Sequence, residues 1–67
     1  MCKYPNVHLK LDLEGPDGNA FMVLGHSKKI MQEADVPEEE IKTMCADAMM
    51  GTYEHLLQTI RTYIKLN

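Results

Sequence analysis

The sequence predicts a small α+β domain with two layers, in which helices cover one face of a small sheet. Three observations support this fold class. Apolar and polar residues alternate over residues 7–13, which is the period of a half-buried strand. Beyond residue 20, apolar residues recur every three or four positions, which is the period of helices with one buried face. The 67 residues suffice for a single domain, 1–67, with a modest core.

The strand is expected to end at a cluster of turn-forming residues, 15–18, and the first helix to follow it from Ala20 to Ala34. Asn19 is a favourable N-cap because its side chain can accept a hydrogen bond from the first turn. The predicted core positions of this helix are its apolar residues, Phe21, Val23, Leu24, Ile30, Met31 and Ala34. Gly25 lies in the middle of this helix and costs about 1 kcal/mol relative to alanine. A close helix crossing, a functional gap or a tolerated weak position would each explain it.

The second helix is expected to begin near Pro37, where Asp35 and the glutamates that follow place negative charge at the positive end of the helix dipole. Gly51 is expected to close this helix in the left-handed conformation. The predicted core positions share helical spacing: Ile41, Met44, Cys45, Ala48 and Met49.

Thr52 is the predicted N-cap of a third helix. Its core positions are Tyr53, Leu56, Leu57, Ile60, Tyr63 and Ile64. Residues 63–67 would either continue this helix or form a short strand, and the strand gives the order β-α-α-α-β. A lone strand needs a partner, which is either this tail or the same strand of a second subunit.

Charge and composition exclude several classes of function. The formal net charge is −3 and no basic tract is present, so nucleic-acid binding is not expected. No apolar run is long enough to span a bilayer, and no segment resembles a signal peptide. Two cysteines, Cys2 and Cys45, make no disulfide framework. We therefore expect a cytoplasmic protein with reduced thiols and no membrane association, and a homo-oligomer remains open.

The sequence contains no recognisable catalytic constellation. The three histidines, His8, His26 and His55, fall on three different predicted elements. No metal-ligand spacing, glycine-rich phosphate loop, H-E-x-x-H or C-x-x-C motif is present. We expect no enzyme activity, no catalytic residue, no metal and no cofactor.

Two segments are candidate binding sites. The turn entering the first helix would present free backbone N–H groups to a small anionic ligand. Lysines and an arginine would add positive charge, and the set is Gly18, Asn19, Lys28, Lys29 and Arg61. The second candidate is an acidic surface for a basic partner protein, formed by Glu33, Asp35, Glu38, Glu39 and Glu40. An ordinary helix cap and a solvated helix start are the structural alternatives. Met22 and Met50 fall outside the core spacing and are expected to be exposed.

Several of these motifs together resemble a family of short phage and prophage proteins. The segments are Gly18-Asn19-Ala20-Phe21 with Leu24-Gly25, then Glu39-Glu40-Ile41, then Gly51-Thr52-Tyr53-Glu54-His55-Leu56-Leu57. Thr52, Pro37 and Tyr63 stand where the family usually has aspartate, serine and tryptophan.

The resemblance implies a phage-encoded protein in the host-cell cytoplasm. Its expected function is non-enzymatic: stoichiometric binding and inhibition of a host protein, in particular a component of anti-phage defence. One alternative is an oligomeric sponge that sequesters a nucleotide-type immune signal at helix N-termini. Another is a structural or housekeeping phage protein.

Overall fold

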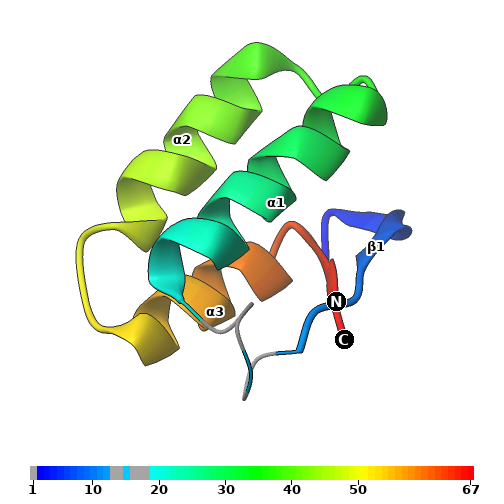
Figure 1. Cartoon of the computed structure of the whole chain (residues 1–67). Helices are drawn as coiled ribbons and strands as arrows, with labels where there is room; N and C mark the ends of the chain where they lie inside the picture. Colours follow the sequence, from blue (N-terminus) through cyan, green and yellow to red (C-terminus); the bar gives the residue numbers. More distant parts are fainter. Residues whose placement is uncertain (1, 13–14, 16–18) are drawn as a thin grey trace.

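In a computed structural model, the described residues, 2–12, 15 and 19–67, form two strands and three helices (Figure 1). Their order is β1 (Tyr4–Leu9), α1 (Ala20–Glu33), α2 (Glu38–Ala48), α3 (Tyr53–Arg61) and β2 (Ile64–Leu66). This confirms the predicted α+β class. It also decides that residues 64–66 form a strand rather than a continuation of the third helix.

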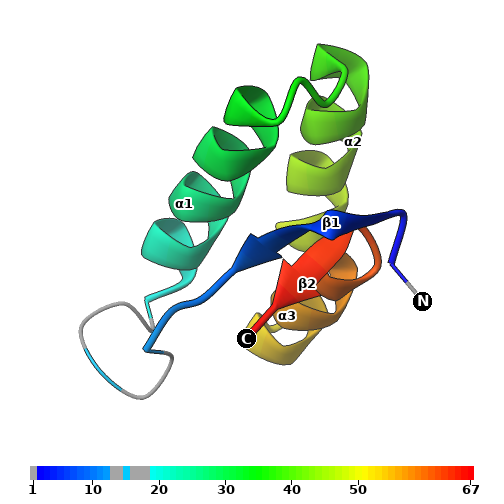
Figure 2. The same ribbon diagram turned by 90° about the vertical axis from the view of Figure 1, so that its right-hand side faces the viewer.

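The two strands pair in parallel, and the described residues place no third strand beside them (Figure 2). The register joins Tyr4 to Ile64, His8 to Lys65 and Leu9 to Leu66, with an irregularity between Tyr4 and His8. Pro5, which has no N–H to donate, lies within that irregularity. β1 begins earlier than the predicted 7–13 and ends at Leu9, because the three-residue β2 limits how far pairing extends. Leu13, at the predicted end, lies outside the described residues.

The three helices cover one face of the sheet, with α1 and α2 antiparallel and α3 crossing beside them (Figures 1 and 2). Strand residues Val7, Ile64 and Leu66 point into this layer and are buried. They meet the buried faces of the helices and of the α1–α2 connection, formed by Val23, Met31, Val36, Ile41, Met44, Ala48, Leu56 and Ile60. Helical spacing therefore locates most of the core correctly.

The α1 boundaries follow from local hydrogen bonds. Asn19 is the N-cap, as predicted, and its side chain accepts from the Phe21 N–H at 2.8 Å. At the other end Asp35 is left-handed, with φ of 63°. The Val36 N–H donates to the Met31 carbonyl at 3.0 Å, which is the bonding of a Schellman motif. Asp35 thus closes α1, and it also precedes the N-cap of α2, Pro37, as predicted.

The α2–α3 connection differs from the prediction at two residues. Gly51 does not have a positive φ. The residue instead makes room, because an added Cβ would lie 3.1 Å from the Cβ of His55. Met49 is 62% exposed rather than part of the core. α2 ends at Ala48, so the chain turns before Met49 reaches the interior. Thr52 caps α3 as predicted, accepting from the His55 N–H at 3.2 Å.

Candidate functional site

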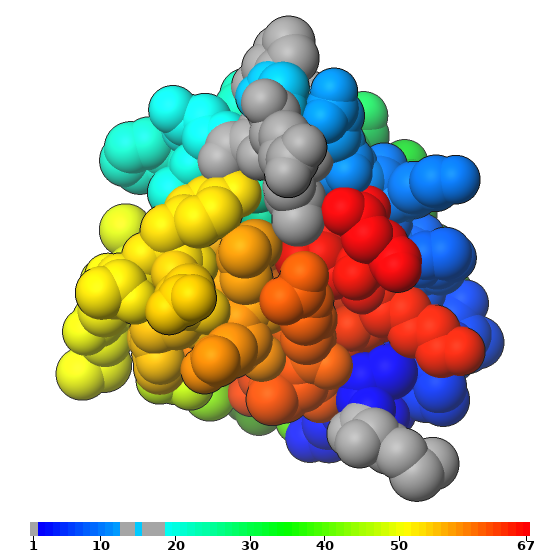
Figure 3. Space-filling view, turned by 90° about the horizontal axis from the view of Figure 1, so that it is seen from below, coloured from blue at the N-terminus to red at the C-terminus, as the bar shows by residue number. Residues whose placement is uncertain are grey.

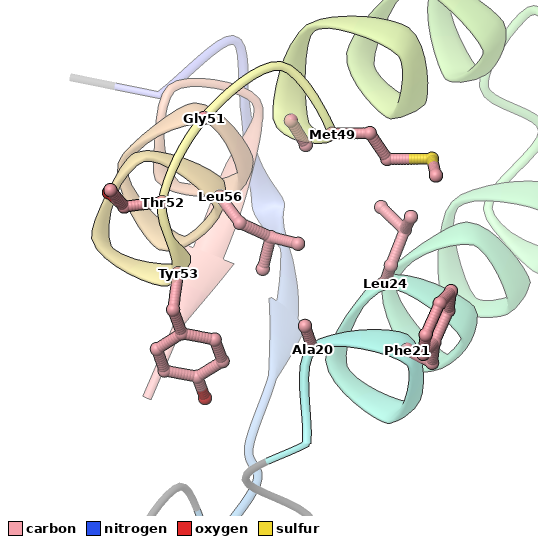
Figure 4. Close-up of a pocket in the computed structure, with 9 residues that line it drawn as sticks. Ala20, Phe21, Leu24, Met49, Gly51, Thr52, Tyr53 and Leu56 are labelled. Atoms are coloured by element: carbon pink, nitrogen blue, oxygen red, sulfur yellow. The ribbon is translucent and has the colours of Figure 1, made fainter.

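A cavity of about 200 Å³ opens where the start of α1, the end of α2 and the start of α3 meet (Figure 4). Leu24, Ala48 and Leu56 line it with aliphatic carbon. Phe21 and Tyr53 stand on opposite sides of its opening, and Met49 points across it from the end of α2. Apolar surface therefore dominates this pocket.

Large apolar side chains around the pocket are exposed to solvent. Phe21 is 77% exposed, Met49 62%, Met50 80% and Tyr53 37%. We call these four residues the apolar patch. Sequence spacing assigned Phe21, Met49 and Tyr53 to the core, and only Met50 was expected at the surface. Three of the four line the pocket, and Met50 follows Met49 in the chain; exposed apolar side chains gathered in this way are a feature of interaction surfaces.

The helix caps position the two aromatic residues. The Asn19 cap fixes the first turn of α1, and with it Phe21, while the Thr52 cap fixes the first turn of α3, and with it Tyr53. Because each aromatic residue lies in a first turn, beyond the central part of the helix interface, its ring extends past the core. The exposure of both rings is a consequence of where the helices begin.

The pocket also brings together the two segments that contribute most to the phage-protein resemblance. Ala20 and Phe21 come from the first, and Gly51, Thr52 and Tyr53 come from the second. About thirty residues separate them in the sequence. Both segments therefore line one pocket, in addition to capping helices and packing in the core.

His55, next to the patch, makes contacts that serve a structural role. The His55 Nε2 lies 2.9 Å from the Asp47 carbonyl oxygen and 3.6 Å from its carboxylate Oδ1. The Thr59 Oγ1 lies 3.4 Å from the same nitrogen. A nucleophile–histidine–carboxylate relay requires both ring nitrogens, one for each partner. Here all three contacts converge on one nitrogen, so the ring fastens α3 to the end of α2.

Cys45 is also part of the packing. It lies half-buried on α2, and burial raises the pKa of its thiol, with a smaller opposing effect from Lys28. A raised pKa leaves less thiolate and therefore a weaker nucleophile. No group of three or more histidine, cysteine or acidic side chains that could hold a metal occurs in the described part of the chain.

The predicted anion-binding residues are not gathered around the start of α1. Asn19 uses its side chain as the cap, and Gly18 lies outside the described residues. Lys28 and Lys29 are exposed and lie about 13–15 Å farther along the helix axis. Arg61 lies at the end of α3. The start of α1 is instead close to the start of α3, where Ala20 shares a pocket with Tyr53.

The predicted acidic surface lies at the opposite end of the α1–α2 pair from the apolar patch. Glu33 and Asp35 end α1, whereas Glu38 and Glu39 begin α2, and all four are exposed. Glu40 is bonded within the protein instead: its carboxylate accepts from the Lys3 ammonium and the Tyr4 hydroxyl. Four of the five acids thus remain at the surface.

No protein family, curated protein or solved structure matches this chain. No helix in the described residues is long and apolar enough to cross a membrane.

Proposed function

We propose that this protein is a non-enzymatic binding domain that acts by occupying a partner protein stoichiometrically through the apolar patch. One observation supports this most directly. The segments that resemble phage proteins converge on one pocket, yet they leave Phe21 77% exposed beside it. An aromatic ring that stays exposed adds little to the stability of an isolated domain, whereas aromatic side chains buried in an interface supply much of the binding free energy.

The pocket chemistry narrows the kind of partner. A cavity of about 200 Å³ with aliphatic walls accepts a large apolar side chain from a partner segment. Met49 and Met50 add unbranched, polarisable side chains that adapt to an irregular surface. Asp47 and Glu54, both exposed, each adjoin a pocket-lining residue in the sequence. The partner segment is therefore apolar at its centre and basic at its margin.

The resemblance supplies the biological setting of the proposal. For a phage accessory protein, the partner is a host protein in the infected cell, and binding inhibits it by covering a functional surface, in particular in anti-phage defence. The separation of Lys28, Lys29 and Arg61 from Asn19 gives the nucleotide-sponge alternative no comparable support.

The test is affinity capture from bacterial lysate followed by native mass spectrometry, with three forms of the protein. The wild-type protein should retain one host polypeptide in a fixed ratio, and Phe21→Ser should lose it. Serine and phenylalanine have similar helix propensities, so α1 should persist.

Met22→Ser is the matched control, because Met22 is the next residue of the same helix and is 44% exposed but does not line the pocket. This variant should retain the polypeptide. Capture that Phe21→Ser leaves unchanged would contradict the proposal. Equal loss in both variants would assign the effect to α1 rather than to the pocket.

A further inference from the structure

A second depression, separate from the apolar patch, lies beside β2 and the end of α3. Its volume is about 580 Å³, and it is open to solvent. On the face shown in Figure 3, the end of α3, β2 and part of the N-terminal segment 2–9 lie side by side. Gln58 and Thr62 contribute polar groups to it, whereas Ile64 and Leu66, which also border it, are buried.

Among the described residues that line this depression, Arg61 and Lys65 carry positive charge and none has an acidic side chain. His8 also lines it, with an imidazole ring. His8 and Lys65 are register partners in the sheet, and both are exposed. Residues adjacent to them along the strands, Val7 and Ile64, are buried against the helices. Alternation along a strand therefore directs His8 and Lys65 together to the open face of the sheet.

Arg61 and Lys65 form no ion pair with an acidic side chain in the described part of the chain. The ion pairs found there use Lys3 and His55. Four exposed acids gather instead at the α1–α2 connection, away from the sheet. Two cations that line one depression can both contribute charge-assisted hydrogen bonds to an anion placed between them.

We propose that this depression binds a small organic dianion, a phosphomonoester or a dicarboxylate. The planar guanidinium of Arg61 can bond two oxygens of one phosphate or carboxylate group, and Lys65 adds a point charge. The depression is much larger than an inorganic ion, so an organic body has room beside the bound anionic group. The site is independent of the apolar patch and goes beyond the proposed function.

The test is a titration of the ¹⁵N-labelled chain, followed by NMR, with AMP, succinate and inorganic phosphate as probes. AMP or succinate should saturate, with shifts concentrated over residues 61–66, and the probe that saturates identifies the anionic group. Arg61→Ala and Lys65→Ala should each weaken binding by about tenfold, the loss expected for one charge-assisted hydrogen bond.

Lys28→Ala and Lys29→Ala are the matched controls, because they remove the same charge from an exposed face elsewhere, and both should leave binding unchanged. Shifts spread over all the lysines, or equal losses in the controls, would show general charge attraction and overturn the inference. So would the absence of saturation by every probe at millimolar concentration. Inorganic phosphate binding as tightly as AMP would overturn the role assigned to the organic body.

Discussion

Gly25→Ala should stabilise the protein. Gly25 lies inside α1 and is exposed, and a Cβ built on it meets nothing within 4 Å. This geometry removes a close helix crossing within the described residues as the reason for glycine. Alanine gains the helix propensity that glycine lacks and restricts the unfolded chain, at no steric cost here. The expected gain is about 1 kcal/mol, which corresponds to a rise in Tm of roughly 4–8 °C for a domain of this size.

Urea unfolding followed by far-UV circular dichroism measures this gain, with Gly51→Ala as the matched control. The chemical change is the same, but the new Cβ at Gly51 would lie 3.1 Å from side-chain atoms of His55. Gly51→Ala should therefore destabilise the protein, by about 1–2 kcal/mol. The two alanine substitutions should shift the unfolding midpoint in opposite directions.

A Gly25→Ala protein that is no more stable than the wild type would refute the reasoning. Such a result would mean that a side chain at this position is unfavourable for a reason other than a steric contact within the described residues. A stabilised variant that fails to bind the partner would instead identify Gly25 as a gap that the partner occupies.

Three further substitutions test the turn, the acid-sensitive contact and the core. Asp35→Gly should stabilise the protein by about 1 kcal/mol, because glycine adopts the left-handed φ without penalty. Thermal melts measure this gain, and an equal gain from Asp35→Ala would assign the effect to charge instead. Hydrogen bonds from Lys3 and then Tyr4 lower the pKa of Glu40 below its ordinary 4.5, so its contribution is present above that pH and disappears as pH falls through the lowered value. Urea midpoints measured across acidic pH should show this loss, and Glu40→Gln should remove that part of the pH dependence; an unchanged profile would contradict it. Ile60→Ala removes a fully buried side chain and should lower the free energy of unfolding by about 2–5 kcal/mol in the same assay, a large share of the stability of so small a domain. A loss below about 1 kcal/mol would mean that the core relaxes into the space.

The sequence alone determined those features that depend on neighbours within one helical turn. The Asn19 and Thr52 caps each bond an amide two or three residues away, so residue type and position suffice to predict them. The same holds for most of the core, because one helical face must be apolar wherever a helix packs on a sheet. The resemblance to phage proteins likewise depends on residue order, and it stays a prediction.

Only the tertiary structure decided which apolar residues near the ends of the helices are buried. Apolar spacing cannot show whether the first or last turn of a helix reaches the core. Phe21, Met49 and Tyr53 therefore read as core residues, yet they surround a pocket at the surface. The lack of room for a side chain at Gly51 depends on where His55 packs, and the start of β1 depends on a strand about sixty residues away. These features arise from contacts between distant segments, and such contacts exist only once the helices and the sheet have packed together.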